Sequence, residues 1–206
     1  MRQMGEIQEE AATRLVEDAM AFAARAHYGV NRKGNGQPYI LHPMEVAVIC
    51  GSLGADREVL AAALLHDTVE DSDATMEEIQ QRFGARVAAL VASETEDKRE
   101  GLPPEETWRI RKEETLEKLR RAEDPGVRIL WLGDKLSNIR SLYRLWKREG
   151  DRTWDYFHQK DPAQQAWYYR SIARELKPLA DTEAYLEFFT RVETIFKGVT
   201  ERGTSL

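Results

Sequence analysis

The chain has 206 residues, of which 42% are hydrophobic and 32% are charged, and its 30 Lys and Arg against 36 Asp and Glu give a formal net charge of −6. These proportions exclude a disordered chain, which would be less apolar, and an integral membrane protein, which would be less charged. The acidic balance argues against general nucleic-acid binding, because attraction to phosphate needs a cationic surface.

Apolar residues recur mainly at three- and four-residue spacing, the pattern of amphipathic helices, whereas the strict alternation typical of strands is almost absent. We therefore expect an all-α protein of about ten helices with frayed ends. We expect one domain over residues 1–206, with its motifs in 26–142 and a helical extension at about 150–199. The expected helices cover about 9–28, 43–50, 56–66, 75–83, 85–96, 105–123, 126–148, 152–159, 162–177 and 181–198.

The negative charge is concentrated in residues 66–81, which carry six carboxylates and no Lys or Arg. The last three of these acids mark the start of a helix, with Thr75 as N-cap, because acidic side chains favour the positive end of the helix dipole. The first three directly follow an apolar segment and need another explanation. The six are Asp67, Glu70, Asp71, Asp73, Glu77 and Glu78.

Two histidines lie where metal ligands would be useful. His42 opens a helix after a loop, and His66 ends a helix beside Asp67. A histidine next to apolar residues is more often packed in a core, but an adjacent imidazole and carboxylate at a helix end can grip one cation. Such a mixed nitrogen and oxygen set suits Mn²⁺, Fe²⁺ or Zn²⁺ better than Ca²⁺ or Mg²⁺.

Glu70 and Asp71 follow the pair His66 and Asp67 by about one helical turn. If the backbone stays helical, this spacing returns both acids to the side of the metal pair. Carboxylates there can accept a proton from an attacking water, whose pKa a metal lowers. The alternative is an exposed or ion-paired couple.

Asp134 interrupts the apolar helix that covers about 126–148, and Asn138 and Ser141 continue the same stripe at i+4 and i+7. A lone aspartate in so apolar a helix is costly to bury unless it has a partner. A cation held with His42, His66 and Asp67 would be that partner.

Two cations, Arg32 and Lys33, lie in a glycine-rich loop ten residues before His42. Arg can clamp a phosphate through two hydrogen bonds and Lys acts as a point charge, so both are candidates for phosphate binding. A solvated basic pair is the alternative. We expect His27, which ends the first helix, to order this loop rather than to bind a ligand.

The single cysteine, Cys50, cannot build a disulfide framework, so we expect the reducing cytoplasm as the compartment. No apolar run approaches the ~18–20 residues that cross a bilayer, and the first residues lack the apolar core of a signal peptide. We therefore expect no membrane partner. The aromatic C-terminal third could supply an interface for a homo-oligomer.

Three ordered segments carry a resemblance to a known family. AHYGVNRKGNGQPYILHPMEVA (26–47), ALLHDTVEDSDAT (63–75) and LGDKLSNIRSL (132–142) resemble the hydrolase domain of the RelA/SpoT alarmone enzymes. These enzymes belong to the HD-domain metal-dependent phosphohydrolases. The match spans about residues 12–148, and the stand-alone small alarmone hydrolases, which lack a synthetase domain, fit the length best.

The resemblance implies a helical HD-domain bundle with one divalent metal ion, commonly Mn²⁺, and conversion of ppGpp to GDP with loss of the 3′-pyrophosphate. It also implies that the pair Glu70 and Asp71 activates water. The implied metal ligands are His42, His66, Asp67 and Asp134. The implied substrate-binding residues are Arg32 and Lys33 at the base and phosphates, and Tyr39, Asn138 and Ser141 in the nucleoside pocket.

Two positions depart from the family pattern. Trp131 stands where a Lys is usual, and Gly133 stands where an Ala is usual. Loss of a cation near an anionic substrate could redirect phosphate recognition, so another nucleotide or a phosphomonoester is an alternative substrate. A second alternative is a regulatory module that binds a nucleotide without turnover, although such a module would have no chemical need for Glu70 and Asp71.

Overall fold

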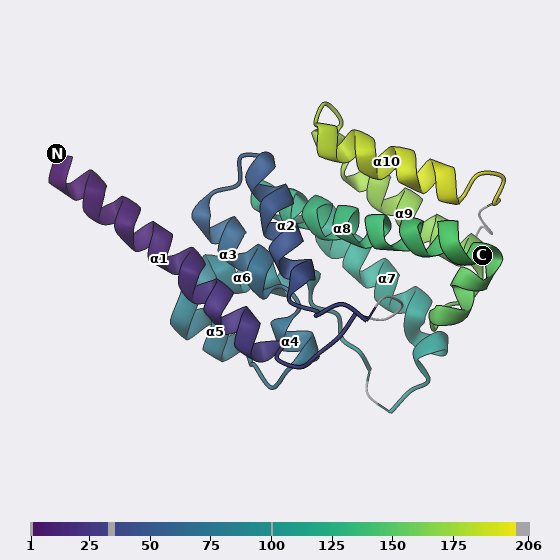
Figure 1. Cartoon of the computed structure of the whole chain (residues 1–206), viewed down its shortest axis with the longest axis horizontal. Helices are drawn as coiled ribbons and strands as arrows, with labels where there is room; N and C mark the ends of the chain where they lie inside the picture. Colours follow the sequence, from purple (N-terminus) through teal and green to yellow (C-terminus); the bar gives the residue numbers. More distant parts are fainter. Residues whose placement is uncertain (1, 33–35, 100, 201–206) are drawn as a thin grey trace. The chain divides into compact units, whose positions relative to one another are not determined.

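The computed structural model describes residues 2–32, 36–99 and 101–200, with side chains from residue 14 onward (Figure 1). Its regular structure there is helical, and the only β pairing in these ranges is an isolated bridge between Asn31 and Pro38. The prediction of an all-α protein is confirmed. Within the described ranges, no helix is long and apolar enough to cross a membrane.

The helices group into two compact units. The first unit comprises residues 1–95 and 124–134. It contains the helices α1 (Arg2–Ala26), α2 (Leu41–Ser52), α3 (Arg57–Leu65), α4 (Thr68–Asp71), α5 (Met76–Phe83) and α6 (Ala85–Glu94), together with the start of α8 (Pro125–Glu149).

The second unit comprises residues 96–123 and 135–206. Its elements are α7 (Pro104–Arg121), the remainder of α8, the 3-10 helix η1 (Gly150–Tyr156), α9 (Pro162–Glu175), the 3-10 helix η2 (Lys177–Leu179) and α10 (Glu183–Ile195). Helix α9 packs against both α7 and α10. The prediction of a single domain over 1–206 stays a prediction.

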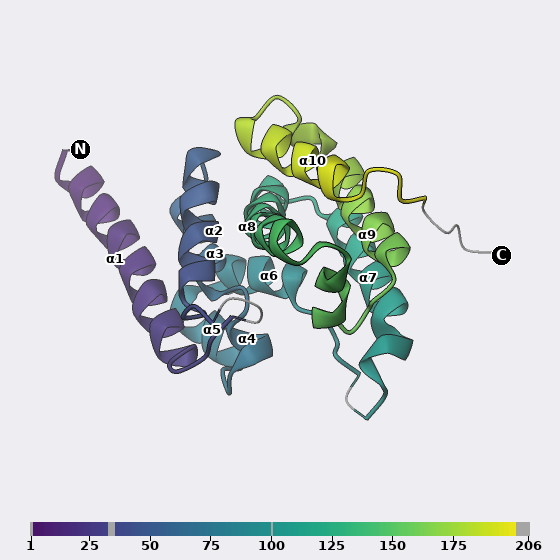
Figure 2. The same ribbon diagram turned by 45° about the vertical axis from the view of Figure 1, so that its right-hand side comes forward.

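Helix α3 forms the centre of the first unit. It packs against α1, α2 and α6, and Figures 1 and 2 both show α2 and α3 side by side. The run from Ala61 to Leu65 is completely buried, because small alanines let neighbouring helices approach closely. The helix starts at Asp56, whose carboxylate accepts hydrogen bonds from the amides of Glu58 and Val59 at 3.0 Å each. His66 lies at the C-terminal end of this central helix, so the packing of α3 fixes its position.

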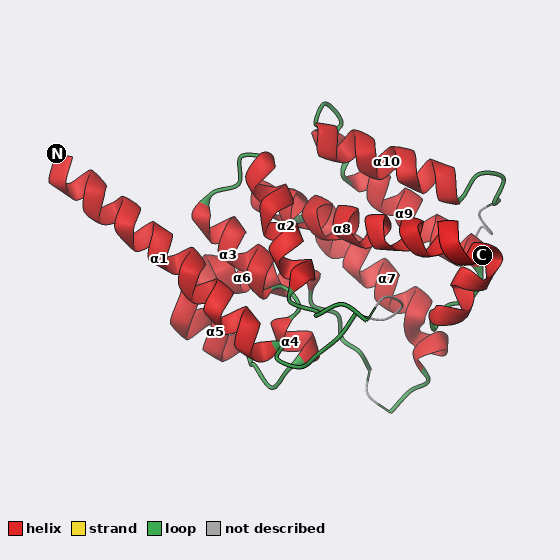
Figure 3. Ribbon diagram, in the orientation of Figure 1, coloured by secondary structure: helices red, strands yellow, loops and turns green. Residues whose placement is uncertain are grey.

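Several helix boundaries differ from the sequence-based expectation (Figure 3). Helix α1 begins at Arg2 rather than near residue 9, and α2 begins at Leu41, so His42 lies inside its first turn. The stretch expected as a helix at 152–159 is the 3-10 helix η1 instead. Gly150, with φ +59°, takes the left-handed conformation that ends α8, and a tighter 3-10 turn follows. Thr75 caps α5 as predicted, accepting from the amide of Glu78 at 3.2 Å.

Candidate active site and metal centre

Four side chains meet in the first unit, although they come from distant parts of the sequence. His42 lies in the first turn of α2, where the following Pro43 costs no hydrogen bond. His66 is the C-cap of α3, and Asp67 is the N-cap of α4. Asp134 comes from α8, nearly 70 positions further along the chain. The turn between α3 and α4 and the first turn of α2 thus face one residue of α8.

Each of the two histidines lies close to both aspartates. Asp134 Oδ1 lies 3.1 Å from His42 Nε2 and 3.6 Å from His66 Nε2. Asp67 Oδ2 lies 3.4 Å from His42 Nε2 and 3.0 Å from His66 Nε2. His42, His66 and Asp134 form a group that could hold a metal ion, with one ligand atom of each within 4.8 Å of the others.

Burial makes this cluster unfavourable without a cation. His42 and His66 are each 2% exposed, and Asp134 is 3% exposed, whereas the side chain of Asp67 keeps 22% of its surface. Burying a carboxylate costs several kcal/mol unless a positive charge or strong hydrogen bonds compensate. The predicted need of Asp134 for a partner is therefore met by groups that also suit a divalent ion.

The tautomer of His66 fits metal binding. Its Nδ1 lies 2.8 Å from the carbonyl oxygen of Ala63. A carbonyl oxygen can only accept, so Nδ1 carries the hydrogen, and the Nε2 of the neutral ring presents a lone pair. This Nε2 faces two carboxylates, so a cation or a proton must lie between them. A backbone carbonyl that orients the far nitrogen is the usual support of a metal-bound histidine.

The pKa values reflect the same pairing. Burial by itself lowers the pKa of His66, but the charge of Asp67 and a hydrogen bond with Asp134 outweigh it and raise this pKa well above its usual value. Burial would raise the pKa of Asp67, yet His66 and His42 hold it well below its usual value. A proton on His66 thus occupies the position that a metal ion would take.

Gly133 lets α8 approach α2 closely enough to place Asp134. A Cβ at this position would lie 2.7 Å from Cys50 Sγ and 3.2 Å from both Val46 Cγ1 and Val46 O. Cys50 is buried, and burial raises the pKa of its thiol to about 12, so it acts as a packing residue. Gly133 stands where the family pattern has Ala, and the sulfur atom of Cys50 occupies the space that the methyl group of an Ala would take.

Trp131, the other departure from the family pattern, is 1% exposed in the core of the first unit. A large ring packs there in place of the usual cation. At Trp131, α8 therefore contributes an apolar side chain to the core, whereas Asp134, three residues later, contributes a carboxylate to the candidate metal site.

The two acids of α4 lie on the turn that follows the ligands. The backbone stays helical through this turn, because the amide of Asp71 donates to the carbonyl oxygen of Asp67 at 3.0 Å. Glu70 is half-buried and Asp71 is exposed. Beside the larger effect of burial, the charge of Asp71 acts to raise the pKa values of both His27 and Tyr39. The condition of a helical backbone is met, and the place of both acids beside the metal ligands stays a prediction.

Tyr39 lies against the metal ligands. Its hydroxyl donates to Asp67 Oδ2 at 2.6 Å, and its ring centroid lies 5.8 Å from that of His42 and 4.9 Å from that of His27. Burial and the charge of Asp67 raise the pKa of Tyr39, so its hydroxyl stays protonated and can donate. Its expected role in the nucleoside pocket stays a prediction.

The other predicted substrate residues are only partly placed. Arg32 is half-buried in the loop before α2, where its amide donates to the carbonyl of Gln37 at 2.8 Å. Lys33 lies outside the described residues. Asn138 and Ser141 lie further along α8, in the second unit, and Ser141 Oγ accepts from Arg144 at 3.1 Å. The roles of these four residues stay predictions.

His27, which is expected to order the loop that follows it, packs its ring against Tyr39 at the end of that loop. It is 2% exposed, and neither ring nitrogen makes a hydrogen bond with any residue that the structure describes. Burial lowers its pKa, against the raising effect of Asp67 and Asp71, so the ring is neutral near pH 7. The sequence shows only that His27 lies in the segment AHYG, just before the loop. The contact of its ring with Tyr39 is visible only in the structure, because the loop must fold to bring the two rings together.

Comparison with known proteins finds an HD domain and relatives that share one enzyme name. The HD domain family matches residues 19–160. A guanosine-3′,5′-bis(diphosphate) 3′-pyrophosphohydrolase of Aquifex aeolicus is 37% identical over 186 residues, which are 88% of this chain and 26% of that protein. The human enzyme of the same name, MESH1, is 44% identical over 136 residues, which are 65% of this chain and 72% of that protein.

Solved structures show the same likeness. A metazoan SpoT ortholog, described as hydrolysing ppGpp, is 26% identical with a TM-score of 0.65, covering 89% of this chain and 94% of its own. The protein lmo0812 of Listeria monocytogenes is 35% identical with a TM-score of 0.66, covering 76% and 99%. The matched region contains the His42, His66, Asp67 and Asp134 cluster, and the chain belongs to the HD-domain family, alongside relatives named ppGpp 3′-pyrophosphohydrolases.

Proposed function

We propose that the protein is a metal-dependent (p)ppGpp 3′-pyrophosphohydrolase, which converts guanosine-3′,5′-bis(diphosphate) to GDP and pyrophosphate. The observation that carries the proposal is the buried group of His42, His66 and Asp134, with Asp67 beside it and two acids one turn further on. The human relative that is 44% identical bears the name of this activity.

We propose one divalent ion, Mn²⁺, held by His42, His66, Asp67 and Asp134. The set of two imidazoles and two carboxylates suits Mn²⁺. When bound, such an ion acts as a Lewis acid that lowers the pKa of water and polarises a phosphate oxygen. Neighbouring residues orient the ligands: the carbonyl of Ala63 fixes the ring of His66, and the packing at Gly133 fixes Asp134.

Glu70 and Asp71 are the proposed acid and base residues. Their carboxylates lie on the turn after Asp67, so they can accept the proton of an attacking water. Water adds to the phosphorus attached to the ribose 3′ oxygen, the bond between them breaks, and the ribose oxygen takes up a proton. Arg32 and Lys33 are proposed to bind the phosphates, and Tyr39, Asn138 and Ser141 the nucleoside.

This activity would place the protein in the stringent response, as an enzyme that removes the alarmone. A cytoplasmic location belongs to the same proposal, and its support is that the lone Cys50 is a buried free thiol. A homo-oligomer is also proposed, on the aromatic character of the C-terminal third.

The proposal is tested by release of pyrophosphate from ppGpp by the Mn²⁺-loaded protein. Asp67→Ala and Glu70→Ala should each lower turnover by about three orders of magnitude, because one removes a ligand and the other a proton acceptor. Glu77→Ala, an exposed acid at the start of α5, is the matched control and should keep wild-type turnover. Unchanged turnover in both site variants contradicts the residue assignment.

A second candidate keeps the site and changes the substrate. The observation in its favour is Trp131, which packs in the core where the family pattern has a cation. A panel of nucleotides and phosphomonoesters, assayed by phosphate and pyrophosphate release, separates the two: activity on another compound with none on ppGpp supports this candidate. Tight ppGpp binding with no product in the presence of metal would instead support a non-catalytic nucleotide-binding module.

A further inference from the structure

We propose that Tyr39 is a positioning residue for Asp67: its hydroxyl holds the carboxylate of Asp67 toward His42 and His66, and the ring of His27 keeps Tyr39 in place. The inference rests on the proposed metal centre and adds to it two residues that touch no metal ion themselves.

The hydroxyl of Tyr39 and the two imidazoles meet at the same oxygen atom. Asp67 Oδ2 accepts from Tyr39 at 2.6 Å and lies 3.0 Å from His66 Nε2. A carboxylate oxygen has two lone pairs, so one can accept the phenol while the other points at a cation. Hydrogen bonds of this kind to ligating carboxylates orient them and contribute to metal affinity.

Asp67 lacks the hydrogen bonds by which an aspartate before a helix is usually oriented. An aspartate that caps a helix has an extended backbone and accepts from the amide two or three residues later. Asp67 instead has helical backbone angles, φ −93° and ψ −6°, and within the described residues its side chain makes no capping hydrogen bond. Its carboxylate faces the histidines, and Tyr39 is the donor that orients it.

The hydroxyl of Tyr39 contacts one ligand only, Asp67. His66 is oriented by the carbonyl of Ala63, and Asp134 is 3% exposed on α8. His42 contacts the ring and the backbone carbonyl of Tyr39, which a change to Phe keeps. Removal of the hydroxyl alone should therefore act on Asp67, which keeps 22% of its side-chain surface and is the most exposed of the four ligands.

Tyr39 is itself held rigidly. Its amide donates to the carbonyl of Val30 at 2.8 Å, and its carbonyl accepts from the amide of His42 at 2.8 Å. Its ring lies close to two imidazoles, with the centroid of His27 at 4.9 Å and that of His42 at 5.8 Å. The buried ring of His27 thus packs against Tyr39 and helps to hold it in place.

The test is the dissociation constant of Mn²⁺ for the full chain, measured by electron paramagnetic resonance without substrate. Tyr39→Phe removes only the hydroxyl, so Asp67 loses the donor that orients its carboxylate, and Mn²⁺ affinity should fall about 10- to 100-fold. The matched control is Tyr185→Phe, which removes a buried hydroxyl that donates to Ala173 O at 2.9 Å in the second unit. It should lower the melting temperature and leave Mn²⁺ affinity unchanged.

His27 is tested by a pair of substitutions. His27→Phe keeps a flat ring against Tyr39 and should retain Mn²⁺ affinity, whereas His27→Ala should weaken it as Tyr39→Phe does. Equal loss in both His27 variants contradicts a packing role for this ring.

Steady-state kinetics separate positioning from substrate binding. Saturating Mn²⁺ should restore most of the turnover that Tyr39→Phe loses at limiting Mn²⁺, because the defect lies in holding the ion. An unchanged Mn²⁺ affinity with a raised KM for ppGpp would overturn the inference and leave Tyr39 as a nucleoside contact alone.

Failure of the proposed function can be distinguished from failure of this inference. If the wild type binds Mn²⁺ and Tyr39→Phe weakens it, but ppGpp is not hydrolysed, the substrate is wrong and the positioning role stands. If the wild type binds no divalent ion, the metal centre and the inference are both overturned.

Discussion

The histidine cluster of the first unit and two acidic clusters of the second unit balance their charges in opposite ways. In the first unit, His42, His66 and Asp134 gather imidazoles and carboxylates around one point. In the second unit, Glu96 is held by Lys112 and by Arg111 Nη1, the latter at 3.0 Å. Burial by itself would raise the pKa of Glu96, but Lys112, Lys135 and Arg111 hold it below its usual value.

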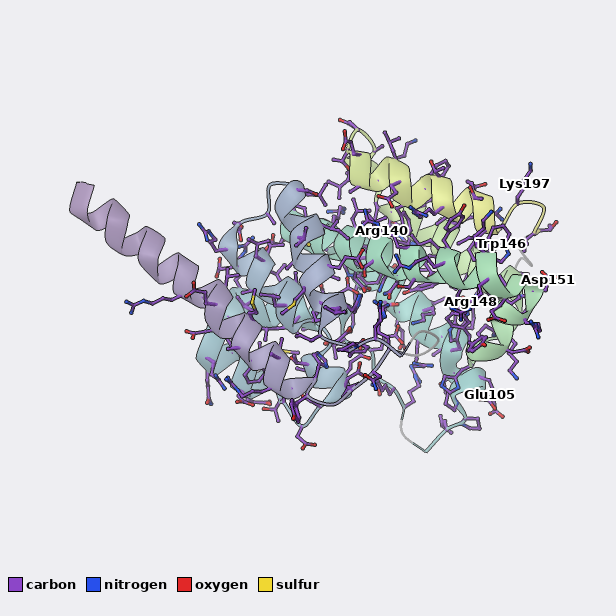
Figure 4. The ribbon with its side chains drawn as sticks, viewed as in Figure 1. Glu105, Arg140, Trp146, Arg148, Asp151 and Lys197 are labelled. Carbon is purple, nitrogen blue, oxygen red and sulfur yellow. The ribbon has the colours of Figure 1, made fainter. Side chains whose placement is uncertain are left out.

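A second cluster of the second unit is built in the same way. Glu187 of α10 accepts from Arg140 Nη2 at 2.6 Å and from Arg191 Nε at 2.9 Å (Figure 4 labels Arg140 on α8). A guanidinium carries a permanent charge, so the pairs of this unit are complete without an added ion. The imidazoles of the first unit carry charge only when protonated, so that cluster is completed by a proton or a metal. The difference makes His42, His66 and Asp134 the candidate metal site, because the arginine-paired acids have no need of an added ion.

The largest expected effect comes from Asp134→Asn, which keeps the shape of the side chain and removes its charge. Mn²⁺ affinity should fall at least about 100-fold and ppGpp turnover by about three orders of magnitude, because a ligand of the buried group is neutralised. Isothermal titration with Mn²⁺ and a pyrophosphate-release assay measure the two effects.

Asp124→Asn is the control for this substitution within the same unit. Asp124 pairs with Arg86 at 2.8 Å, so its loss should reduce stability without changing Mn²⁺ affinity. Equal loss of Mn²⁺ affinity in both variants would remove the distinction between the two kinds of cluster.

Gly133→Ala tests the packing that places Asp134. The added methyl group would lie 2.7 Å from Cys50 Sγ, and overpacking of this kind costs about 1–3 kcal/mol of unfolding free energy. Mn²⁺ affinity should fall as well, because the next residue is a ligand. Urea unfolding and Mn²⁺ titration measure both effects.

Cys50→Ala should relieve part of this cost, so the double variant should lose less stability than the sum of the single variants. Gly51→Ala is the control on the same helix, since a Cβ there meets only Leu60 Cδ2 at 3.8 Å. It should be neutral or stabilise by up to about 1 kcal/mol. Strictly additive single costs would contradict the proposed contact.

Glu187→Gln gives the smallest effect and should be confined to stability. Arg140 and then Arg191 lower the pKa of Glu187 to about 2, below the value of about 4.3 in an unfolded chain. Its stabilisation is therefore fully present above about pH 4.3 and is lost as the pH falls toward 2. The variant should lose about 1 kcal/mol at pH 7, as a partly exposed pair does.

Thermal unfolding at pH 7 and pH 3 checks the sign, because the difference from wild type should shrink at the lower pH. Mn²⁺ affinity and ppGpp turnover should stay at wild-type values. A loss of Mn²⁺ affinity in this variant would show that the paired charges of the second unit also serve the metal centre.

Much of the fold was predictable because helical signals are local. The apolar spacing of three and four residues predicted the all-α class and most helices, and Thr75 predicted the start of α5. The stretch at 152–159 was mistaken for an α-helix, because its pattern also fits the 3-10 helix that follows Gly150. Periodicity does not distinguish these two helix types over seven residues.

The candidate ligands were also predictable, since buried acids and histidines in apolar segments need partners. His42, His66 and Asp134 do come together, and α4 stays helical after Asp67 as the spacing of Glu70 and Asp71 required. The sequence by itself therefore determined the residue types of the candidate metal centre and most of the helices that carry them.

Only the tertiary structure decided how these ligands are held. The 2.6 Å hydrogen bond from Tyr39 to Asp67, the ring of His27 behind Tyr39, and the close approach at Gly133 join segments that are 12 or more residues apart. Such contacts depend on how α1, α2, α3 and α8 pack, and helix periodicity carries no information on packing distance. The local sequence therefore determines which groups bind, and the packing of the helices determines where their atoms lie.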